Sequence, residues 1–520
     1  MNTTIGFPTL GDLIKFIYDA FGVLARKRGL ENEIDETEKK SLQTALSRLA
    51  NEECDINEKS KELIKKLANL IAGHIRDPRT NLMIGEVLID ILEVYQATLK
   101  DDTSFLDKKG TMKWFLLEYG IKRFNFSIKK HFFRFNVSAV NLTLPEGLWF
   151  LPSFEDGKII YPIEKVMSWI YHECSVSPKD FHYPDRTNSA DHEQQERNLE
   201  NALNWIKGES LPSLSALLWN FNSSISHFNN VKHSSVKVGI DDELRNSFCI
   251  ALTIARASTC AFKIAKENYD LSELIEFCEH YRKSSDDVSD EFLQHEKYMN
   301  SYLTKKELSQ QAIDKVWFDA TNQFVVYLAD RGRHLLKILD NLSRDDRYEK
   351  LTDSEFVNLL RREFGRWTLS VVAMEYSLTN STPELVRKAL SRSSKLMANV
   401  GVTENELESF LLWLKEKGID SYLPWMPHWI KGQNYFKKNE YPEAFDNLKN
   451  AYEMAKYRAG HYQSHILSHF LKVAAINRKR KEFKQAGRWA RYLGLEVYGF
   501  EIDELSEENL DSTFEKWSYA

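Results

Sequence analysis

The residues best suited to chemistry in this sequence lie between positions 456 and 491. This segment holds ten lysines and arginines against a single acid, Glu482, with aromatic side chains between them. Cations can neutralise phosphates and aromatic rings can stack on bases, so the pattern is typical of a nucleic-acid-binding surface. The contacts that it predicts are Arg478, Lys479, Arg480, Lys481, Lys484 and Arg488. The acidic segment 496–515 offers the alternative that it folds back and neutralises these cations.

Three histidines in the same segment, His461, His465 and His469, recur every four residues and share one face of a helix. Two of them could bind a metal if a carboxylate completed the site, but no acid lies near them in sequence. We expect them to pack against aromatic side chains, and we expect neither a metal nor a cofactor. The sequence lacks a phosphate loop, a nucleophile elbow and a zinc-protease motif, which argues against catalysis. A dispersed catalytic site stays open.

A second set of candidate contacts lies on a helix-turn segment further upstream. Residues 199–206 have helical periodicity, Gly208 ends that helix, and Pro212-Ser213 begins the next, which is expected to reach Phe221. An aromatic residue, Trp205, followed by this glycine and this Pro-Ser start resembles the later helices of Cro/repressor-type helix-turn-helix domains. The resemblance covers about 195–225 and implies DNA contacts from one helix face. Those residues are Arg197, Asn201 and Asn204.

The segment 38–72 resembles a degenerate copy of the same unit. Its residues Leu42, Ala45, Leu46, Leu49 and Glu52 match residues 157 positions later in the chain. Internal duplication explains this match, and so does a chance likeness of two amphipathic helices. The contacts predicted in this copy are Gln43, Thr44, Ser47 and Arg48. Glutamates flank both segments and would repel phosphates, so we expect a packing role more than DNA binding.

Residues 425–495 resemble tetratricopeptide repeats. The first unit is carried by Gly432, Tyr435, Tyr441, Ala444, Leu448 and Ala451, because small residues are needed where two helices cross closely. A poorer second unit is carried by Ala474, Phe483, Ala486 and Ala490, and its alanine at 486 lies 42 residues after Ala444, beyond the usual repeat of about 34. The resemblance implies a concave face that takes a peptide or protein segment. The candidates near that face are Tyr435, Asn439 and Asn447.

Composition and periodicity predict a mostly all-α protein, since glycine (21) and proline (12) are scarce in 520 residues. One small β-hairpin is expected where 155–157 separates 148–151 from 158–161. Polar residues suggest a loop over 178–196 and a linking segment over 222–238. Further helices are expected at 114–136, 248–269, 271–281, 307–342, 356–378 and 383–399.

Four regions follow from these patterns. They are a helical module over 1–140, a hairpin with a helix-turn-helix-like module over 141–230, a helical bundle or array over 231–420, and tetratricopeptide-like hairpins with an acidic tail over 421–520.

Charge and cysteine usage restrict the environment of the protein. A net charge of −6 provides no overall basic field for nucleic acid. Five scattered cysteines without a Cys-x-x-Cys pair indicate reduced thiols. The N-terminal residues do not have the pattern of a signal peptide, and the apolar run 249–265 contains Arg256 and Lys263, which is typical of a buried helix. We therefore expect a cytoplasmic protein without a membrane partner.

These patterns favour a non-catalytic regulator or scaffold that binds a protein or peptide on its repeat region, with DNA binding by the helix-turn-helix-like segments as a further expectation. The layout is similar to that of regulators with a helix-turn-helix first and a peptide-sensing repeat region last. On this analogy, binding on the repeats biases the N-terminal half. The alternative is a nucleic-acid-binding effector of a bacterial anti-phage or toxin-type system that uses residues 456–491. The sequence does not indicate the oligomeric state.

Overall fold

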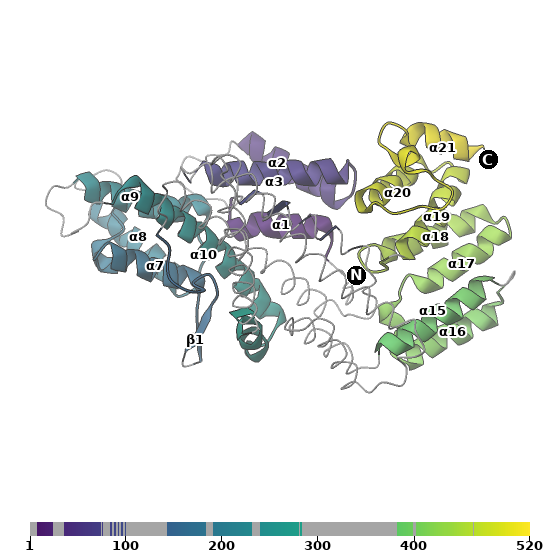
Figure 1. Ribbon diagram of the computed structural model, residues 1–520, viewed down its shortest axis with the longest axis horizontal. Coiled ribbons are helices and arrows are strands. Elements are labelled where there is room, and N and C mark those ends of the chain that lie inside the picture. The colour runs from purple at the N-terminus through teal and green to yellow at the C-terminus, as the bar shows by residue number, and fades with distance from the viewer. Residues whose placement is uncertain are drawn as a thin grey trace, which may run out of the picture.

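The computed structural model describes residues 8–23, 36–73, isolated positions between 75 and 99, 143–155, 157–183, 191–230, 240–279, 281–282, 382–398, 402–460 and 462–519. Within these residues the chain is mostly helical and the one sheet has two strands (Figure 1). This confirms the predicted fold class. The helices predicted at 114–136, 307–342 and 356–378 lie outside the described residues.

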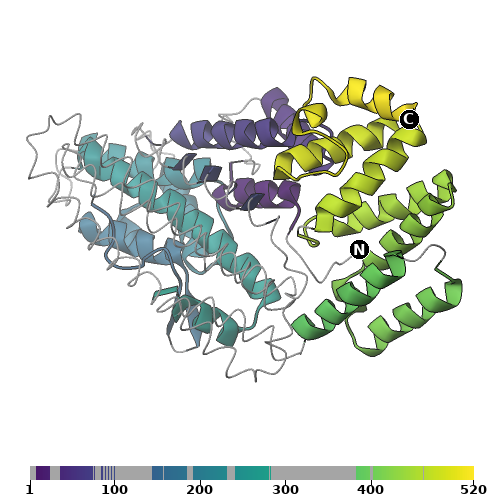
Figure 2. The same ribbon diagram turned by 45° about the vertical axis from the view of Figure 1, so that its right-hand side comes forward.

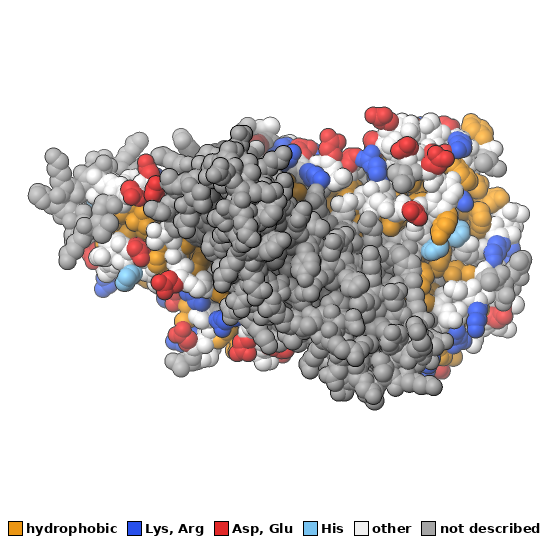
Figure 3. Space-filling view, viewed as in Figure 1, with side chains coloured by type: hydrophobic (Ala, Val, Ile, Leu, Met, Phe, Trp, Pro, Cys, Tyr) orange, Lys and Arg blue, Asp and Glu red, His pale blue; other side chains and the backbone are white. Residues whose placement is uncertain are grey.

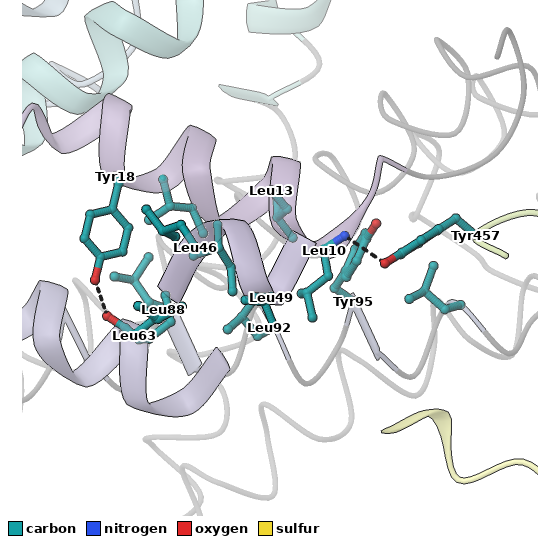
Figure 4. Close-up of a cluster of buried hydrophobic side chains, with 14 of the residues drawn as sticks. Leu10, Leu13, Tyr18, Leu46, Leu49, Leu63, Leu88, Leu92, Tyr95 and Tyr457 are labelled. Atoms are coloured by element: carbon teal, nitrogen blue, oxygen red, sulfur yellow. Dashed lines mark hydrogen bonds between the residues drawn. The ribbon is translucent and has the colours of Figure 1, made fainter. Parts of the chain in front are cut away.

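The first three helices, α1 (Leu10–Phe21), α2 (Glu36–Ala50) and α3 (Ile56–Ala72), pack together. The crossing of α1 and α2 is close, because a Cβ atom on Gly11 would lie 2.5 Å from the Cα atom of Ala50. Leucines from all three helices fill the space between them (Figure 4). The hydroxyl of Tyr18 donates to the carbonyl of Leu63 at 2.6 Å, so this ring is buried with its polar atom satisfied.

The predicted hairpin is present, with its first strand later than expected. Strands β1 (Ser153–Glu155) and β2 (Lys158–Ile160) are antiparallel, with Phe154 opposite Ile159. Residues 148–151 form a turn before β1. The large side chains of Trp149 and Phe150 are buried there, and so hydrophobicity alone suggested a strand at the wrong place.

Four further helices are described in the N-terminal half: α7 (Pro162–Glu173), α8 (Asp191–Ile206), α9 (Leu214–Asn230) and α10 (Asp242–Asn268). The predicted loop over 178–196 is wrong at both ends, because Pro178–Asp180 is a 3-10 turn (η2) and α8 begins at Asp191. The predicted link over 222–238 is helical as far as Asn230. Its serines are tolerated there because the buried Ser224 hydroxyl donates to the carbonyl of Asn220.

The long helix α10 runs across this half in contact with α1, α7 and α9 (Figure 2). By length and composition its segment Asp242–Glu267 could cross a membrane, but 67% of its most apolar window is buried inside the protein. Cys249, Ala251 and Leu252 are among its buried residues. The burial of α10 inside the protein agrees with the buried helix predicted for the apolar run 249–265.

The C-terminal half is a stack of helical hairpins. Its elements are α15 (Thr382–Ala398), α16 (Glu404–Glu416), η4 (Asp420–Tyr422), α17 (Met426–Lys437), α18 (Tyr441–Ala455), α19 (Tyr462–Ile476), α20 (Arg480–Leu493), η5 (Ile502–Leu505) and α21 (Leu510–Ser518). The helices α15, α17, α19 and α21 contact one another in that order, while α18 contacts α17 and α19, and α20 contacts α19, α21 and α3 (Figure 1). The stack therefore has one layer of alternate helices and a second layer of their hairpin partners.

Small residues allow the close crossing of α17 and α18 in this stack. A Cβ atom on Gly432 would lie 2.6 Å from the Cγ atom of Leu448, and Ala444 and Ala451 are fully buried. The hairpin turns have left-handed residues at Asn439 and Arg478. The two turns are thus 39 residues apart, and Phe483, not Ala486, takes the place of Ala444 in the second hairpin.

Candidate functional site

The basic segment forms α20 and the helix ends beside it, and the acidic tail covers one side of α20. Arg480 pairs with Asp511 at 3.3 Å and also with Glu515, and Lys484 pairs with Asp511 at 2.8 Å. The guanidinium of Arg488 makes a two-pronged contact with the Glu507 carboxylate. The fold-back of the tail, which was the alternative to nucleic-acid binding, is present in the structure.

The other side of α20 contacts the turn between α2 and α3, residues 51–55. Lys481 lies 3.7 Å from Glu53, Arg491 pairs with Asp55, and the Gln485 amide donates to the carbonyl of Asn51 at 3.1 Å. These contacts join residues more than 400 positions apart. Four of the six predicted nucleic-acid contacts on this helix, Arg480, Lys481, Lys484 and Arg488, are therefore in ion pairs within the protein.

The centre of this contact is a buried ion pair. The Lys456 ammonium lies 2.6 Å from the Glu52 carboxylate, and their side chains are 10% and 7% exposed. Burial raises the pKa of Glu52, an effect that Lys456 only partly offsets. Burial alone would lower the pKa of Lys456, but Glu52 and Glu453 outweigh it and raise that pKa. Charged groups out of water require such a partner, so each holds the other in place.

Tyr457 extends the same contact to the first helix. Its hydroxyl accepts a hydrogen bond from the backbone N–H of Leu10 at 3.2 Å and donates to Glu52 at 3.4 Å (Figure 4). Both Glu52 and Tyr457 have positive φ angles, 54° and 63°. Left-handed backbone is unfavourable for such side chains, and here it directs them into a shared contact.

The two remaining predicted contacts, Arg478 and Lys479, are exposed and lie over aromatic rings. The Arg478 guanidinium is 5.6 Å from the ring centre of Tyr519, and the Lys479 ammonium is 5.6 Å from that of Phe445. A phosphate backbone needs a row of available cations. Arg478 and Lys479 are only two cations, and the cations of α20 next to them are in ion pairs within the protein. This arrangement is poorly suited to binding a phosphate backbone.

The residues predicted to read DNA lie on two separate helices. Gln43, Thr44, Ser47 and Arg48 are exposed along one face of α2, where the Thr44 hydroxyl donates back to the carbonyl of Lys40. On α8, Arg197 and Asn201 are exposed and Asn204 is half-buried, and Arg197 lies 3.6 Å from Glu193. Figure 1 shows α2 and α8 in different parts of the N-terminal half.

The turns that precede α3 and α9 are both in contact with other parts of the protein. The carbonyl of Pro212 accepts from Arg256 at 3.0 Å, and that of Gly208 accepts from Lys263 at 2.5 Å. Arg256 also donates to the carbonyls of Asp19 and Ala20 at the end of α1. These polar contacts connect the start of α9 to α1 and α10 through the turn, in which Pro212 is buried while Glu209 and Ser210 are exposed.

The three predicted peptide contacts are used inside the first hairpin. Tyr435 is half-buried against the core. The side chain of Asn439, in the turn, accepts from the Tyr441 hydroxyl at 2.9 Å, and Asn447, on α18, donates to the carbonyl of Glu443 at 2.9 Å. Both are local contacts, one between the turn and the first residue of α18 and the other within α18 itself.

A different group of residues, which we call the α17–α19 face, joins two of the predicted histidines to residues that sequence reasoning missed: Trp429, Gln433, His465, His469 and Lys472. The Trp429 ring lies 6.5 Å from each of the two imidazoles. This confirms that these histidines pack against aromatic rings. The spacing of Trp425, Trp429 and Gln433 along α17 was the available signal, but only tertiary packing places that stripe beside the histidines of α19.

The α17–α19 face has an unusual balance of hydrogen-bonding groups. Trp429 and Gln433 are 5% and 7% exposed, and their Nε1 and Nε2 atoms have no hydrogen-bond partner in the structure described here. Burial lowers the pKa of His465, and it lowers the pKa of His469 to about 4. Both rings are therefore neutral near pH 7. Figure 3 shows histidines at the surface among hydrophobic side chains in this part of the stack.

A buried histidine in the N-terminal half, His182, is the residue closest in character to a dispersed catalytic centre. The imidazole of His182 contacts the Tyr171 hydroxyl at 2.7 Å and the Asn220 side-chain oxygen at 2.6 Å. Its exposed fraction is 0%, and burial lowers its pKa to about 4. Both ring nitrogens are occupied by protein groups, so the site is suited to joining α7 and α9 and not to binding a substrate.

Metal binding has no support in the described part of the chain, where no three His, Cys, Asp or Glu side chains are grouped closely enough to hold an ion. No family model, curated protein or solved structure matches this chain.

Proposed function

We propose that the protein is a non-catalytic cytoplasmic regulator or scaffold that binds a protein or peptide segment on its C-terminal helical stack. The observation that carries this proposal is the α17–α19 face. There the buried nitrogen atoms Trp429 Nε1 and Gln433 Nε2 have no hydrogen-bond acceptor in the described residues. Stacked hairpins create extended surfaces of this type, which are suited to binding chains more than to chemistry. The resemblance of this region to tetratricopeptide repeats points to the same use.

The contact of the 51–55 turn with α18 and α20 supports a link between the stack and the N-terminal half. Lys456 directly follows α18 and Arg491 lies in the last turn of α20. A shift of either helix would therefore disturb the ion pair with Glu52 or with Asp55. A partner that binds the stack and repositions these helices would thereby change the N-terminal half. A ligand produces such coupling only by the difference in its affinity for the two arrangements.

Nucleic-acid binding is the competing function, through α20 or through the helix-turn-helix-like segments. The exposed positions of Arg478 and Lys479, and of the polar residues on α2, are the observations in its favour. Neighbouring carboxylates count against it, since phosphates would have to displace Asp511, Glu515 and Glu507 from their cations.

The test is affinity purification of the tagged full-length chain from its source cells, with and without nuclease. We expect a protein partner that is retained after nuclease treatment and binds the purified chain directly in calorimetry. A variant with Arg478, Lys479, Arg480 and Lys481 changed to Ala should still bind it. Recovery of nucleic acid alone, with binding that falls about 10³-fold or more as salt rises and is lost in this variant, would establish the competing function.

A further inference from the structure

We propose that the α17–α19 face binds an acidic, extended segment of a partner protein. This inference rests on the proposed function and goes further, because it names the residues of the site and the chemistry of its ligand. Its core is formed by Trp429 and Gln433 of α17 and by His465, His469 and Lys472 of α19.

The first argument is the kind of hydrogen-bonding group that the face offers. An indole nitrogen can only donate, and so can a side-chain amide nitrogen and an ammonium. Trp429 Nε1 and Gln433 Nε2 are buried and lack acceptors in the described residues. Buried donors are nearly always satisfied in folded proteins, since an unmade hydrogen bond is costly. In this arrangement neither atom is reached by solvent, so a ligand that brings oxygen acceptors would satisfy both after the two side chains turn toward it, as interface side chains commonly do on binding.

The second argument is charge. The helices α17 and α19 contain Lys431, Lys437 and Lys472 and several histidines, but no aspartate or glutamate. The Lys437 ammonium donates to the carbonyl of Met397, and the cations of α20 are paired with acids of the tail and of the 51–55 turn. Carboxylates on a partner are therefore the complementary charge for Lys472 on α19, since three acids of the tail are already paired with α20.

The third argument is the aromatic border of the face. Tyr498 is 63% exposed and its ring is stacked on His465, with ring centres 5.1 Å apart. The Lys472 ammonium lies 5.4 Å from the ring centre of Trp517. Exposed aromatic rings next to a cation can hold the apolar side chains and backbone of an extended peptide. Stacking surfaces would also suit a single-stranded nucleic acid, but a single available lysine on α19 is too few for its phosphates.

The experiment is a selection of random peptides on the purified full-length chain, followed by titration of synthetic copies monitored by tryptophan fluorescence. We expect the selected peptides to be enriched in Asp and Glu and to bind more weakly as salt rises. Selection of peptides without this enrichment would overturn the inference, as would failure to select any peptide. The proposed function would survive either result if the affinity purification recovers a folded protein partner.

Two matched lysine variants test where the peptides bind. Lys472→Met keeps the aliphatic stem and should weaken binding by about tenfold, the value of one charge-assisted hydrogen bond. Lys415→Met makes the same change at an exposed position of α16 and should leave affinity unchanged. Equal affinities of these two variants would place the peptides elsewhere and overturn the inference.

Gln433→Met separates a ligand role from a structural one. Since the Gln433 amide nitrogen has no partner in the protein, its replacement should leave thermal stability unchanged or higher, while peptide affinity falls. Loss of stability with unchanged affinity would show that the glutamine serves the fold. A short oligothymidine that binds the face more tightly than the selected peptides would likewise overturn the assignment to an acidic protein segment.

Discussion

The turns that end α2 and α8 have the same local hydrogen bonds and different surroundings. In the first, Glu53 N–H donates to the carbonyl of Arg48 and Glu52 N–H to that of Leu49. In the second, Glu209 and Gly208 make the corresponding bonds to Asn204 and Trp205. This is the pattern that ends many helices with one left-handed residue. That residue is Glu52, with φ 54°, in one turn and Gly208, with φ 69°, in the other.

The surroundings explain the difference between these two residues. A Cβ atom on Gly208 would lie 2.8 Å from the ring of Tyr161, so a side chain has no room there. At Glu52 a side chain is required, because its carboxylate reaches the buried Lys456. The comparison teaches that tertiary contacts, not local backbone preference, determine which residue occupies this position of the turn.

The hydrogen bonds also correct the alignment of the two segments. Glu52 corresponds to Gly208, an offset of 156 residues, and not to Glu209 as the sequence match suggests. With this offset the buried residues Leu46 and Leu49 correspond to Ala202 and Trp205, which are also buried. Internal duplication stays a prediction, since the connections to α3 and α9 differ in length.

The largest expected effect is at the buried ion pair. Lys456→Met leaves the Glu52 carboxylate buried without a partner and should lower the free energy of unfolding by about 3–5 kcal/mol in urea denaturation. Adding Glu52→Gln should recover most of the loss. The matched change at the other turn, Lys263→Met, removes a hydrogen bond to Gly208 and should cost about 1 kcal/mol. Equal losses in the two single variants would contradict the difference between the two surroundings.

The next effect is acid sensitivity beside α8, the helix that the second turn ends, where the His182 carbonyl accepts from Asn198 and the His182 ring joins α7 and α9. Its pKa is about 4 in the folded protein and about 6.5 in the unfolded chain. The unfolded chain therefore binds more protons between these values. The contribution of His182 to the free energy of unfolding should be constant above pH 6.5 and fall by about 3 kcal/mol as the pH decreases to 4.

The measurement is denaturation at a series of pH values. The variant is His182→Asn, because asparagine tolerates the left-handed backbone at this position. It should make the plot of unfolding free energy against pH flatter. His469, whose pKa is also about 4, contributes a similar slope, and His469→Gln removes it separately. An unchanged slope in the double variant would refute the assignment to these two histidines.

A smaller effect tests the requirement for glycine. Gly208→Ala places a Cβ atom against the Tyr161 ring in left-handed backbone and should cost about 1–3 kcal/mol of unfolding free energy. Gly157→Ala has the same type of backbone, with φ 74°, and open space around it, so it should cost only about 1 kcal/mol. The difference between the two measures the contact with Tyr161, and identical losses would show that this contact is unimportant.

The smallest effect compares the residues that begin the next helices. Asp55 accepts from Glu58 N–H at the start of α3, and Ser213 accepts from Ala216 N–H at the start of α9. Each change to Ala should cost about 1 kcal/mol. The loss at Asp55 should be larger by a few tenths of a kcal/mol because it also pairs with Arg491. Asp55→Asn keeps the hydrogen bond from Glu58 N–H and removes only the ion pair with Arg491, so it should show the loss due to the ion pair alone. If Asp55→Asn costs as much as Asp55→Ala, the whole effect belongs to the ion pair.

The sequence contained enough information for the fold class and for several local features. Helical periodicity identified α8, α10 and α15, and the small side chains at Gly432 and Ala444 identified the close crossing of α17 and α18. These features depend on neighbours within about one or two helices. The helix end at Asn230 was missed because Ser and Asn are usually found in loops, while Ser223 and Ser224 are buried here.

The candidate site was less accessible to such reasoning. The histidine stripe of α19 was visible in the sequence, but its packing against Trp429 depends on how two hairpins stack. The contacts of Lys456 and Arg491 could not be anticipated either, because their partners Glu52 and Asp55 lie about 400 residues earlier. Charge counts alone made these residues look available to phosphates.

The separation of Glu52 and Lys456 by 404 positions has a consequence during translation. Ribosomes add about 5–20 residues per second, so the 51–55 turn leaves the ribosome some 20–80 s before α18 can cover it. Throughout that interval the Glu52 carboxylate lacks its Lys456 partner and is exposed to solvent together with the apolar residues around it. Nascent chains of this protein should therefore be targets of chaperones until the last hairpins emerge.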